Sequence, residues 1–431
     1  MLLALAGCSG QPGFQLPAGF PAALGGPTPS PTPTATPPPT PSATPVAQPT
    51  ARPARGLVLW VPPQFAPDNS TPAGNLLKQR LADFSAQNDG IPVQVRVKAE
   101  TGPASLLESL SAASGAAPLS LPSVVALNQA DLEAASQQGL IYSLDPYSKL
   151  MGQEDWYNYA RGLSRVQGAT FSLPFAGDAM VLAYRPGQIK LNTPLADWNT
   201  VLRMNQALGF ATGDPQGLFV LSLYLSTGGT IEDAQRRPVL QEDKLTQTLQ
   251  IFADGSQRNV FPYWISQYET SGDVWQAYKD ERLNALVTWV SSYLSALPAD
   301  TTAVPVPPVG KSNQPLATGW GWAVADPDAG HRAMSVKLAE YLSDSEFLAA
   351  WTEAAGYLPA RPSVLAAWKN QSLKALLGAV AVPAQARPPV DTLNSLGPVL
   401  RDAALQVIKN ENDPAQSAKL AIEKLATPEA P

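Results

Sequence analysis

The sequence predicts an α/β fold whose main domain is divided into two lobes. Short apolar runs of strand type alternate with helical spacings between residues 57 and 127, and similar patterns continue to about residue 425. This alternation is typical of a parallel sheet covered by helices. The stretch 56–431 is longer than one ordinary domain, yet no linker-like segment divides it. Two lobes joined by chain crossings are therefore expected.

The first part of this domain predicts a strand–helix–strand–helix–strand unit. An apolar run at 57–61 is ended by two prolines, as in a short buried strand. Leu77, Leu81 and Phe84 then recur at helical spacing. The elements expected in this unit are, in order, a strand at 57–61, a helix ending near 88–90, a strand at 93–97, a helix around 106–110 and a strand at 122–127.

The rest of the domain mixes strands and helices. Two short strands at 169–175 and 179–184 flank Ala176-Gly177-Asp178, whose composition predicts a hairpin turn. Thr193-Pro194 is suited to the start of a helix over 193–208. The later elements expected are helices at 218–226, 243–254 and 272–280, strands at 284–289 and 317–324, and helices at 331–342, 345–355, 395–409 and 416–425.

The composition excludes several kinds of chemistry. One cysteine and one histidine among 431 residues allow no internal disulfide and no multi-Cys or His-rich metal centre, so no cofactor or metal is expected. A net charge of -6 argues against a nucleic-acid partner, because binding to phosphates needs a cationic face. The single histidine, His331, stands at an expected helix start and is interpreted as a solvated side chain rather than a catalytic base.

The first 55 residues have a different character from the rest. They are rich in proline, threonine, serine and alanine without apolar periodicity, which predicts a disordered, semi-stiff stalk. Leu5-Ala6-Gly7-Cys8 resembles a bacterial lipobox, in which the cysteine becomes the amino terminus and carries the lipid. The resemblance implies a signal-peptide remnant at 1–7, a lipidated Cys8 with the stalk at 8–55, and attachment to the cell membrane. An unmodified thiol is the alternative.

A set of segments follows a fixed order along the domain. They are the strand at 57–61, the segments 123–128, 132–141 and 144–145, Leu173-Pro174-Phe175 with Asp178 and Tyr184-Arg185-Pro186, and the segments 193–198, 228–229, 286–289, 319–324 and 356–361. Together they resemble the extracellular solute-binding proteins that serve ABC importers, in particular the sugar-binding branch. Arg185 stands where that family usually has asparagine.

The resemblance implies a periplasmic-binding-protein-like fold with a ligand cleft between the lobes and hinge crossovers. It implies lobe 1 at about 56–180 and 288–335, and lobe 2 at about 181–287 and 336–431. It also implies a small-molecule solute, a carbohydrate above all, that is delivered to a membrane permease. The protein would then not be an enzyme.

The candidate ligand residues are aromatic or polar side chains near expected strand ends and turns. Sugars offer flat C–H faces to aromatic rings and hydroxyl groups to amides, carboxylates and arginine. The candidates are Trp60, Gln64, Asn128, Asp178, Trp264, Trp289, Ser291, Trp320, Trp322, Tyr357 and Arg361. Each also has a structural interpretation: Asn128 suits a helix N-cap, for example, and Trp320 and Trp322 share one strand face and suit the core.

Two other functions remain open from the sequence. A glycoside hydrolase needs only two carboxylates in a cleft, and 35 acidic residues are available, although no spacing singles out a pair. The other is a surface lipoprotein that senses a ligand without a transporter.

Overall fold

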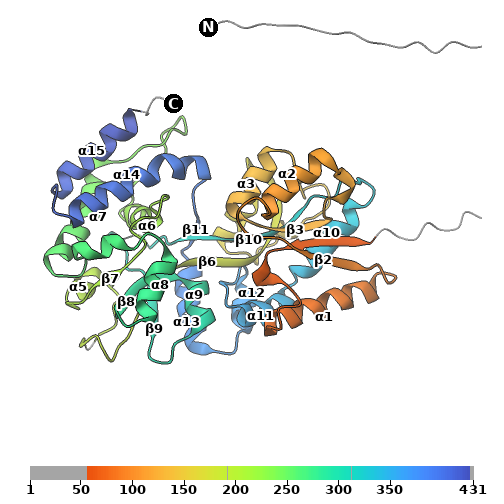
Figure 1. Cartoon of the computed structure of the whole chain (residues 1–431), viewed down its shortest axis with the longest axis horizontal. Coiled ribbons are helices and arrows are strands. Elements are labelled where there is room, and N and C mark those ends of the chain that lie inside the picture. The colour runs from red at the N-terminus through yellow and green to blue at the C-terminus, as the bar shows by residue number, and fades with distance from the viewer. Residues whose placement is uncertain (1–55, 192, 312, 428–431) are drawn as a thin grey trace, which may run out of the picture. The chain divides into compact units, whose positions relative to one another are not determined.

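The computed structural model describes residues 56–191, 193–311 and 313–427 and is built on a mixed β-sheet (Figure 1). The strands follow the order β2-β1-β3-β10-β6-β8-β7, with β11 beside β10 and β9 beside β6. Helices cover the sheet in both halves (Figure 1). The predicted α/β class with two lobes is therefore confirmed. Cys8 and the predicted stalk lie outside the described residues.

The first half begins with the predicted parallel unit. β1 (Leu57–Val61) pairs in parallel with β2 (Val93–Val97) on one side and with β3 (Val124–Asn128) on the other. The helices that connect them are α1 (Pro72–Gln87) and α2 (Leu106–Ala116). Thr71 and Ser105 cap them by accepting hydrogen bonds from the backbone of Gly74 and Glu108.

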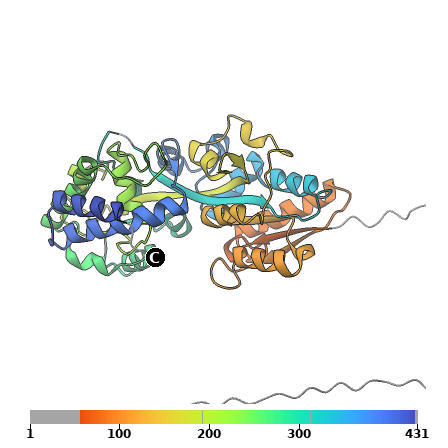
Figure 2. The same cartoon turned by 90° about the horizontal axis from the view of Figure 1, so that it is seen from above.

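A single strand replaces the hairpin predicted at 169–184. β6 (Ser172–Tyr184) runs without a turn, pairing first with β10 (Leu316–Val324) and then with β8 (Ala285–Trp289) and β9 (Thr302–Pro305). The turn prediction was wrong because the glycine at position 177 allows neighbouring groups to pack closely against a continuous strand, instead of forming a turn. A β-carbon there would collide with the Tyr159 hydroxyl and would lie 2.8 Å from the Leu358 carbonyl oxygen. Seen from above, β6 and β10 join the two halves (Figure 2).

The second half is built on the last strands of the sheet. β7 (Leu208–Gly209) pairs with β8, and the helices around them are α6 (Leu218–Ser226), α7 (Glu242–Gln257), α8 (Ser271–Lys279), α14 (Val390–Ile408) and α15 (Pro414–Ala426). The helix predicted at 193–208 is largely absent. Only α5 (Trp198–Val201) forms there, capped by Asp197, and Asn205 adopts a left-handed φ of 50° that interrupts a helix.

Two helices lie in a different half from the one predicted. α10 (Arg332–Leu342) and α11 (Ser345–Ala355) contact α1 of the first half, and α10 also contacts β3. The predicted lobe boundary, which assigned 336–431 to lobe 2, is corrected accordingly for these helices. After these helices, α13 (Gln371–Ala381) contacts β9, and the chain enters the helices of the second half in the segment between β11 (Gln385–Ala386) and α14.

The remaining α-helices and strands have at most 11 residues each. They are the helices α3 (Gln129–Gln137), α4 (Asn158–Leu163), α9 (Val290–Ala296), α12 (Pro362–Ala367) and α13 (Gln371–Ala381), and the strands β4 (Arg165–Val166) and β5 (Ala169–Thr170). Among the described residues, no helix combines the length and the apolar character needed to cross a bilayer. The same residues contain no group of three His, Cys, Asp or Glu side chains arranged for a metal ion.

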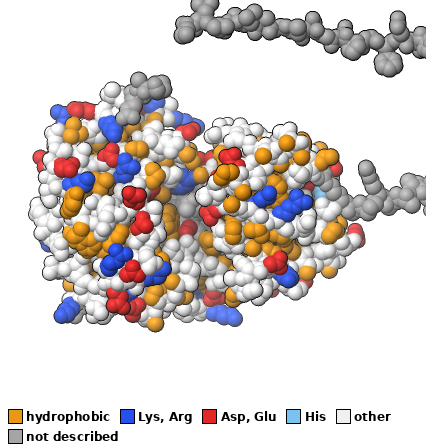
Figure 3. Space-filling view, in the orientation of Figure 1, with side chains coloured by type: hydrophobic (Ala, Val, Ile, Leu, Met, Phe, Trp, Pro, Cys, Tyr) orange, Lys and Arg blue, Asp and Glu red, His pale blue; other side chains and the backbone are white. Residues whose placement is uncertain are grey.

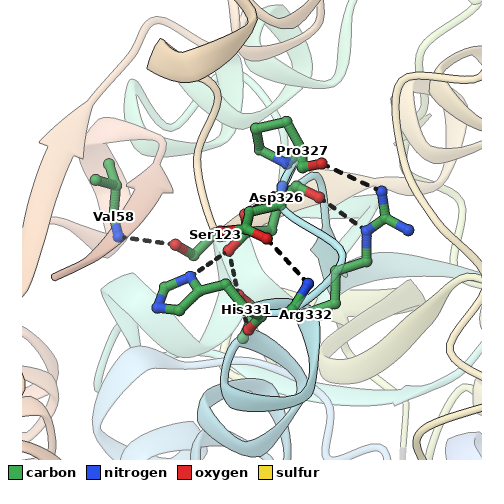
Figure 4. A network of polar contacts seen from close by, with 9 residues as sticks. Val58, Ser123, Asp326, Pro327, His331 and Arg332 are labelled. Atoms are coloured by element: carbon green, nitrogen blue, oxygen red, sulfur yellow. Dashed lines mark hydrogen bonds and ion pairs between the residues drawn. The ribbon is translucent and has the colours of Figure 1, made fainter. Parts of the chain in front are cut away.

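A buried polar network fixes α10 to the end of β10 (Figure 4). Asp326, only 1% exposed, accepts a hydrogen bond from the Ser335 hydroxyl at 2.7 Å, and its carboxylate contacts His331 Nδ1 at 2.7 Å. Arg332 Nε donates to the Asp326 carbonyl oxygen at 2.9 Å. His331 is thus a structural residue at the N-cap of α10, and its interpretation as a solvated side chain was wrong.

Candidate functional site

A cleft with a volume of about 380 Å³ is lined by residues from both halves of the sheet. In the space-filling view, a furrow separates the two halves (Figure 3). The lining residues are Gln64, Glu100, Asn128, Ala130, Asp178, Gln216, Leu218, Trp289, Ser291, Thr318, Gly319, Trp320, Tyr357 and Arg387. Seven of the sequence-predicted residues are among them: Gln64, Asn128, Asp178, Trp289, Ser291, Trp320 and Tyr357.

Three polar side chains enter the cleft from the carboxyl ends of parallel strands. Gln64 follows β1, Glu100 follows β2 and Asn128 ends β3, so all three reach the same edge of the sheet. Gln64 Nε2 donates to Glu100 Oε2 at 3.0 Å. Asn128 Oδ1 caps α3 by accepting from the Asp131 backbone N–H at 2.9 Å. Asn128 therefore caps α3 and also lines the cleft, so it lies where both of its predicted roles need it.

Asp178 lies at the middle of β6, where that strand passes from one half to the other. Its carboxylate accepts hydrogen bonds from the backbone N–H groups of Ser291 and Ala179, each at 3.0 Å, and a short one from the Ser291 hydroxyl. Burial raises the pKa of Asp178 to about 6, and the hydrogen bonds from Ser291 oppose that rise. The carboxylate thereby fastens the start of α9 to β6 in the wall of the cleft.

Three aromatic side chains give the cleft its flat apolar surfaces. Trp289 ends β8, Trp320 lies on β10 and Tyr357 follows α11. Phe65 packs edge-on against Trp320 and Tyr357, with ring centroids 5.3 and 5.4 Å apart. These contacts hold two of the three rings in fixed orientations before any ligand arrives.

The second half contributes Gln216, which precedes α6, and Leu218, the first residue of α6. Asp214 accepts hydrogen bonds from the backbone N–H groups of Gln216 and Leu218, which fixes this segment. Gly397 of α14 lies against it so closely that a β-carbon would be 2.6 Å from the Gln216 Cα. The cleft wall on this side is therefore positioned by the packing of α14.

Arg387 is the only positively charged residue among the described residues that line the cleft. It follows β11, and its backbone N–H donates to the Ala317 carbonyl oxygen at 2.8 Å. Burial lowers the pKa of Arg387, while the charge of Glu133 raises it. The side chain is 6% exposed.

Four sequence-predicted residues lie elsewhere. Trp60 is buried beneath Lys98, whose ammonium lies 4.8 Å from the ring centroid. Trp322 is buried in the core, stacked on Phe175 with centroids 4.0 Å apart. Trp264 is exposed on the second half beside Tyr268. Arg361 forms an ion pair with Asp155, with Nε 2.9 Å from the carboxylate.

Several lining residues were missed by sequence reasoning. Glu100 could have been found, because it follows β2 as Gln64 follows β1 and Asn128 ends β3. Thr318 and Gly319 belong to the strand that was predicted to carry Trp320. Gln216 and Arg387 reach the cleft through long-range packing, for which the sequence carries no local signal.

Comparison with known proteins gives the chain a family. The family model of bacterial extracellular solute-binding proteins matches residues 79–376, more than half of the chain. The chain belongs to this family. As an extracellular solute-binding protein it acts outside the cytoplasm, and the resemblance inferred from the sequence is confirmed. No curated protein sequence matches it significantly.

Solved structures of two-lobed binding proteins share the fold of this solute-binding protein. The sugar-binding protein MalE from Xanthomonas citri is 17% identical, with a TM-score of 0.70 over 86% of this chain and 96% of that chain. Maltose-bound MalE3 from T. maritima is also 17% identical, with a TM-score of 0.64 over 86% and 99%. The GacH receptor of Streptomyces glaucescens, solved unliganded and with acarbose, gives the same identity and TM-score over 86% and 98%.

Proposed function

We propose that this solute-binding protein captures a carbohydrate in the cleft between its two halves and delivers it to an ABC-type membrane permease. The observation that carries the proposal is the composition of that cleft. Aromatic rings at Trp289, Trp320 and Tyr357 lie beside amide and carboxylate groups contributed by both halves. The structural neighbours named for maltose, acarbose or sugar binding support the same ligand class.

The cleft chemistry suits a sugar for two reasons. Trp289, Trp320 and Tyr357 provide surfaces on which the C–H face of a sugar ring can pack. Gln64, Asn128 and the carboxylates provide donors and acceptors for its hydroxyl groups. The volume of about 380 Å³ falls within the usual range of about 300–1,000 Å³ for small-molecule pockets.

Capture would proceed by closure of the two halves around the solute. The halves are joined through β6, through the segment between β9 and β10, and through the segment between β11 and α14. Closure about a few such crossings is a known mode of switching in two-lobed proteins. The division into lobes, with α10 and α11 in the first, is part of this proposal.

The anchor completes the proposed arrangement. A lipid on Cys8 and the Pro-rich stretch to residue 55 would hold the binding domain at the membrane, near its permease. Replacing Cys8 with serine should release the protein from the membrane fraction. If Cys8→Ser stays membrane-bound while the lipid label is lost, the anchor proposal fails.

The experiment that tests the function begins by finding the solute. Native mass spectrometry of freshly purified protein should detect a bound sugar, and a thermal-shift panel should reveal its class, because a ligand stabilises the state that binds it. Incubation with labelled oligosaccharides separates this function from a glycoside hydrolase. Saturable binding without products supports capture for transport, whereas turnover would overturn it. Sugar uptake in cells that lack the protein tests a sensing role without a transporter: reduced uptake supports transport, and unchanged uptake favours sensing.

A further inference from the structure

Arg387 occupies an unusual position for a positive charge. Its backbone is fixed on both sides, since its N–H donates to Ala317 and its carbonyl oxygen accepts from Gln129 Nε2 at 3.1 Å. The side chain is more than nine-tenths buried and lines the cleft. Arg387 is therefore held in the wall of the cleft by a backbone that is fixed on both sides.

The guanidinium has no hydrogen-bond acceptor among the described residues. Nη1 is fully enclosed without a partner, and the other two nitrogens make no hydrogen bond either. Glu133 acts on Arg387 through its charge without a hydrogen bond to it, and its carboxylate oxygen Oε2 accepts from the Val390 N–H at 2.9 Å. By contrast, Arg361 and Arg185, which are equally buried, donate to carboxylate and carbonyl oxygens.

A buried cation without acceptors is costly unless a ligand provides them. We propose that the captured solute is an acidic sugar, a uronic acid or an oligosaccharide containing one, whose carboxylate is bound by the guanidinium of Arg387. This inference rests on the proposed carbohydrate function and narrows its substrate class.

A carboxylate fits this position better than a phosphate. The guanidinium is a planar fork that matches the two oxygens of a carboxylate. Among the described residues, the cleft offers this one cation together with the carboxylates of Glu100 and Asp178. Glu133 already offsets part of the Arg387 charge, so the site suits one added negative charge better than the nearly two charges of a phosphate monoester.

The test compares matched ligands by calorimetry. Hexuronates and uronate oligosaccharides are titrated beside the corresponding neutral hexoses, the methyl-esterified oligosaccharides and hexose 6-phosphates. Each uronate should bind at least about tenfold more tightly than its neutral or methyl-esterified counterpart. Tighter binding of the neutral sugar would overturn the inference and leave the proposed function standing. Preference for the phosphate would overturn the assignment of a carboxylate, and binding of no sugar at all would overturn both proposals.

Variants locate the preference at Arg387. Arg387→Gln should abolish the difference between acidic and neutral ligands, with circular dichroism confirming that the domain is folded. Lys98→Gln, which removes a positive charge outside the cleft lining, should keep the preference. If Arg387→Gln does not fold, Glu133→Gln replaces it, because the amide can still accept from Val390. That variant should bind the uronate more tightly and the neutral sugar unchanged, and equal changes for both ligands would overturn the inference.

Discussion

Replacing Asp178 with asparagine should stabilise the protein at neutral pH, although it alters the centre of the cleft. The partly buried Asp178 carboxylate has a pKa of about 6 in the folded protein, against 3.8 for an ordinary aspartate. Its ionised form is therefore disfavoured by folding, in spite of the hydrogen bonds from Ser291 and Ala179. Asparagine retains an acceptor for the backbone N–H groups and carries no charge to bury.

The magnitude follows from the difference between the two pKa values. One pKa unit corresponds to about 1.4 kcal/mol, so the ionised carboxylate costs about 3 kcal/mol once both states have lost the proton. Because the folded pKa is the higher one, the folded state keeps the proton between about pH 4 and 6 while the unfolded state loses it. The contribution of Asp178 to stability thus falls as the pH rises through this window.

Urea unfolding of the wild type and Asp178→Asn checks this. The variant should have the larger unfolding free energy at about pH 7.5, by up to about 3 kcal/mol, and the gap should shrink to about 1 kcal/mol near pH 4.5. Asp197→Asn is the control: hydrogen bonds from Thr200 lower the pKa of Asp197, so its effect should be equal at both pH values. If Asp178→Asn were less stable than the wild type by the same amount at both pH values, the assigned burial cost would be refuted.

Two further substitutions test interactions that hold the fold together. Gly177→Ala should lower the unfolding free energy by about 1–3 kcal/mol, because the added methyl group meets Tyr159. The control, Gly152→Ala, adds a methyl group in open space and should change the unfolding free energy little. Equal effects of the two substitutions in denaturant unfolding would contradict the packing argument. Asp326→Ala leaves buried donors unpaired and should lower the thermal unfolding midpoint by an amount equivalent to about 1–3 kcal/mol. An unchanged midpoint would show that the network does not stabilise the fold.

Local pattern was sufficient to predict much of the fold. The strand at 57–61 and the helices at 218–226 and 345–355 have the predicted bounds, because each is a clear apolar or amphipathic stretch with a defined end. The errors arose where a residue has two uses. Gly177 and Asp178 have the chemistry of a turn, but the glycine allows close backbone approach and the aspartate anchors α9.

The site was predicted in part, for a reason that can be stated physically. Side chains that follow parallel strands reach one edge of the sheet, so Gln64 and Asn128 could be placed from the sequence. Trp320 and Trp322 share a strand face, and only packing against Phe175 decides that Trp322 belongs to the core. Arg387 enters from a segment more than 250 residues after the strand-end residues, so its place depends on the assembled fold.

The central claim is that the cleft between the two halves binds the sugar, and a calorimetric titration tests it most directly. The sugar that binds the wild type should bind Trp289→Ala at least about tenfold more weakly, since the substitution removes an aromatic face from the cleft. Trp264→Ala, which removes an exposed tryptophan outside the cleft lining, should bind as the wild type does. Unchanged affinity in Trp289→Ala, or an equal loss in both variants, would contradict the account.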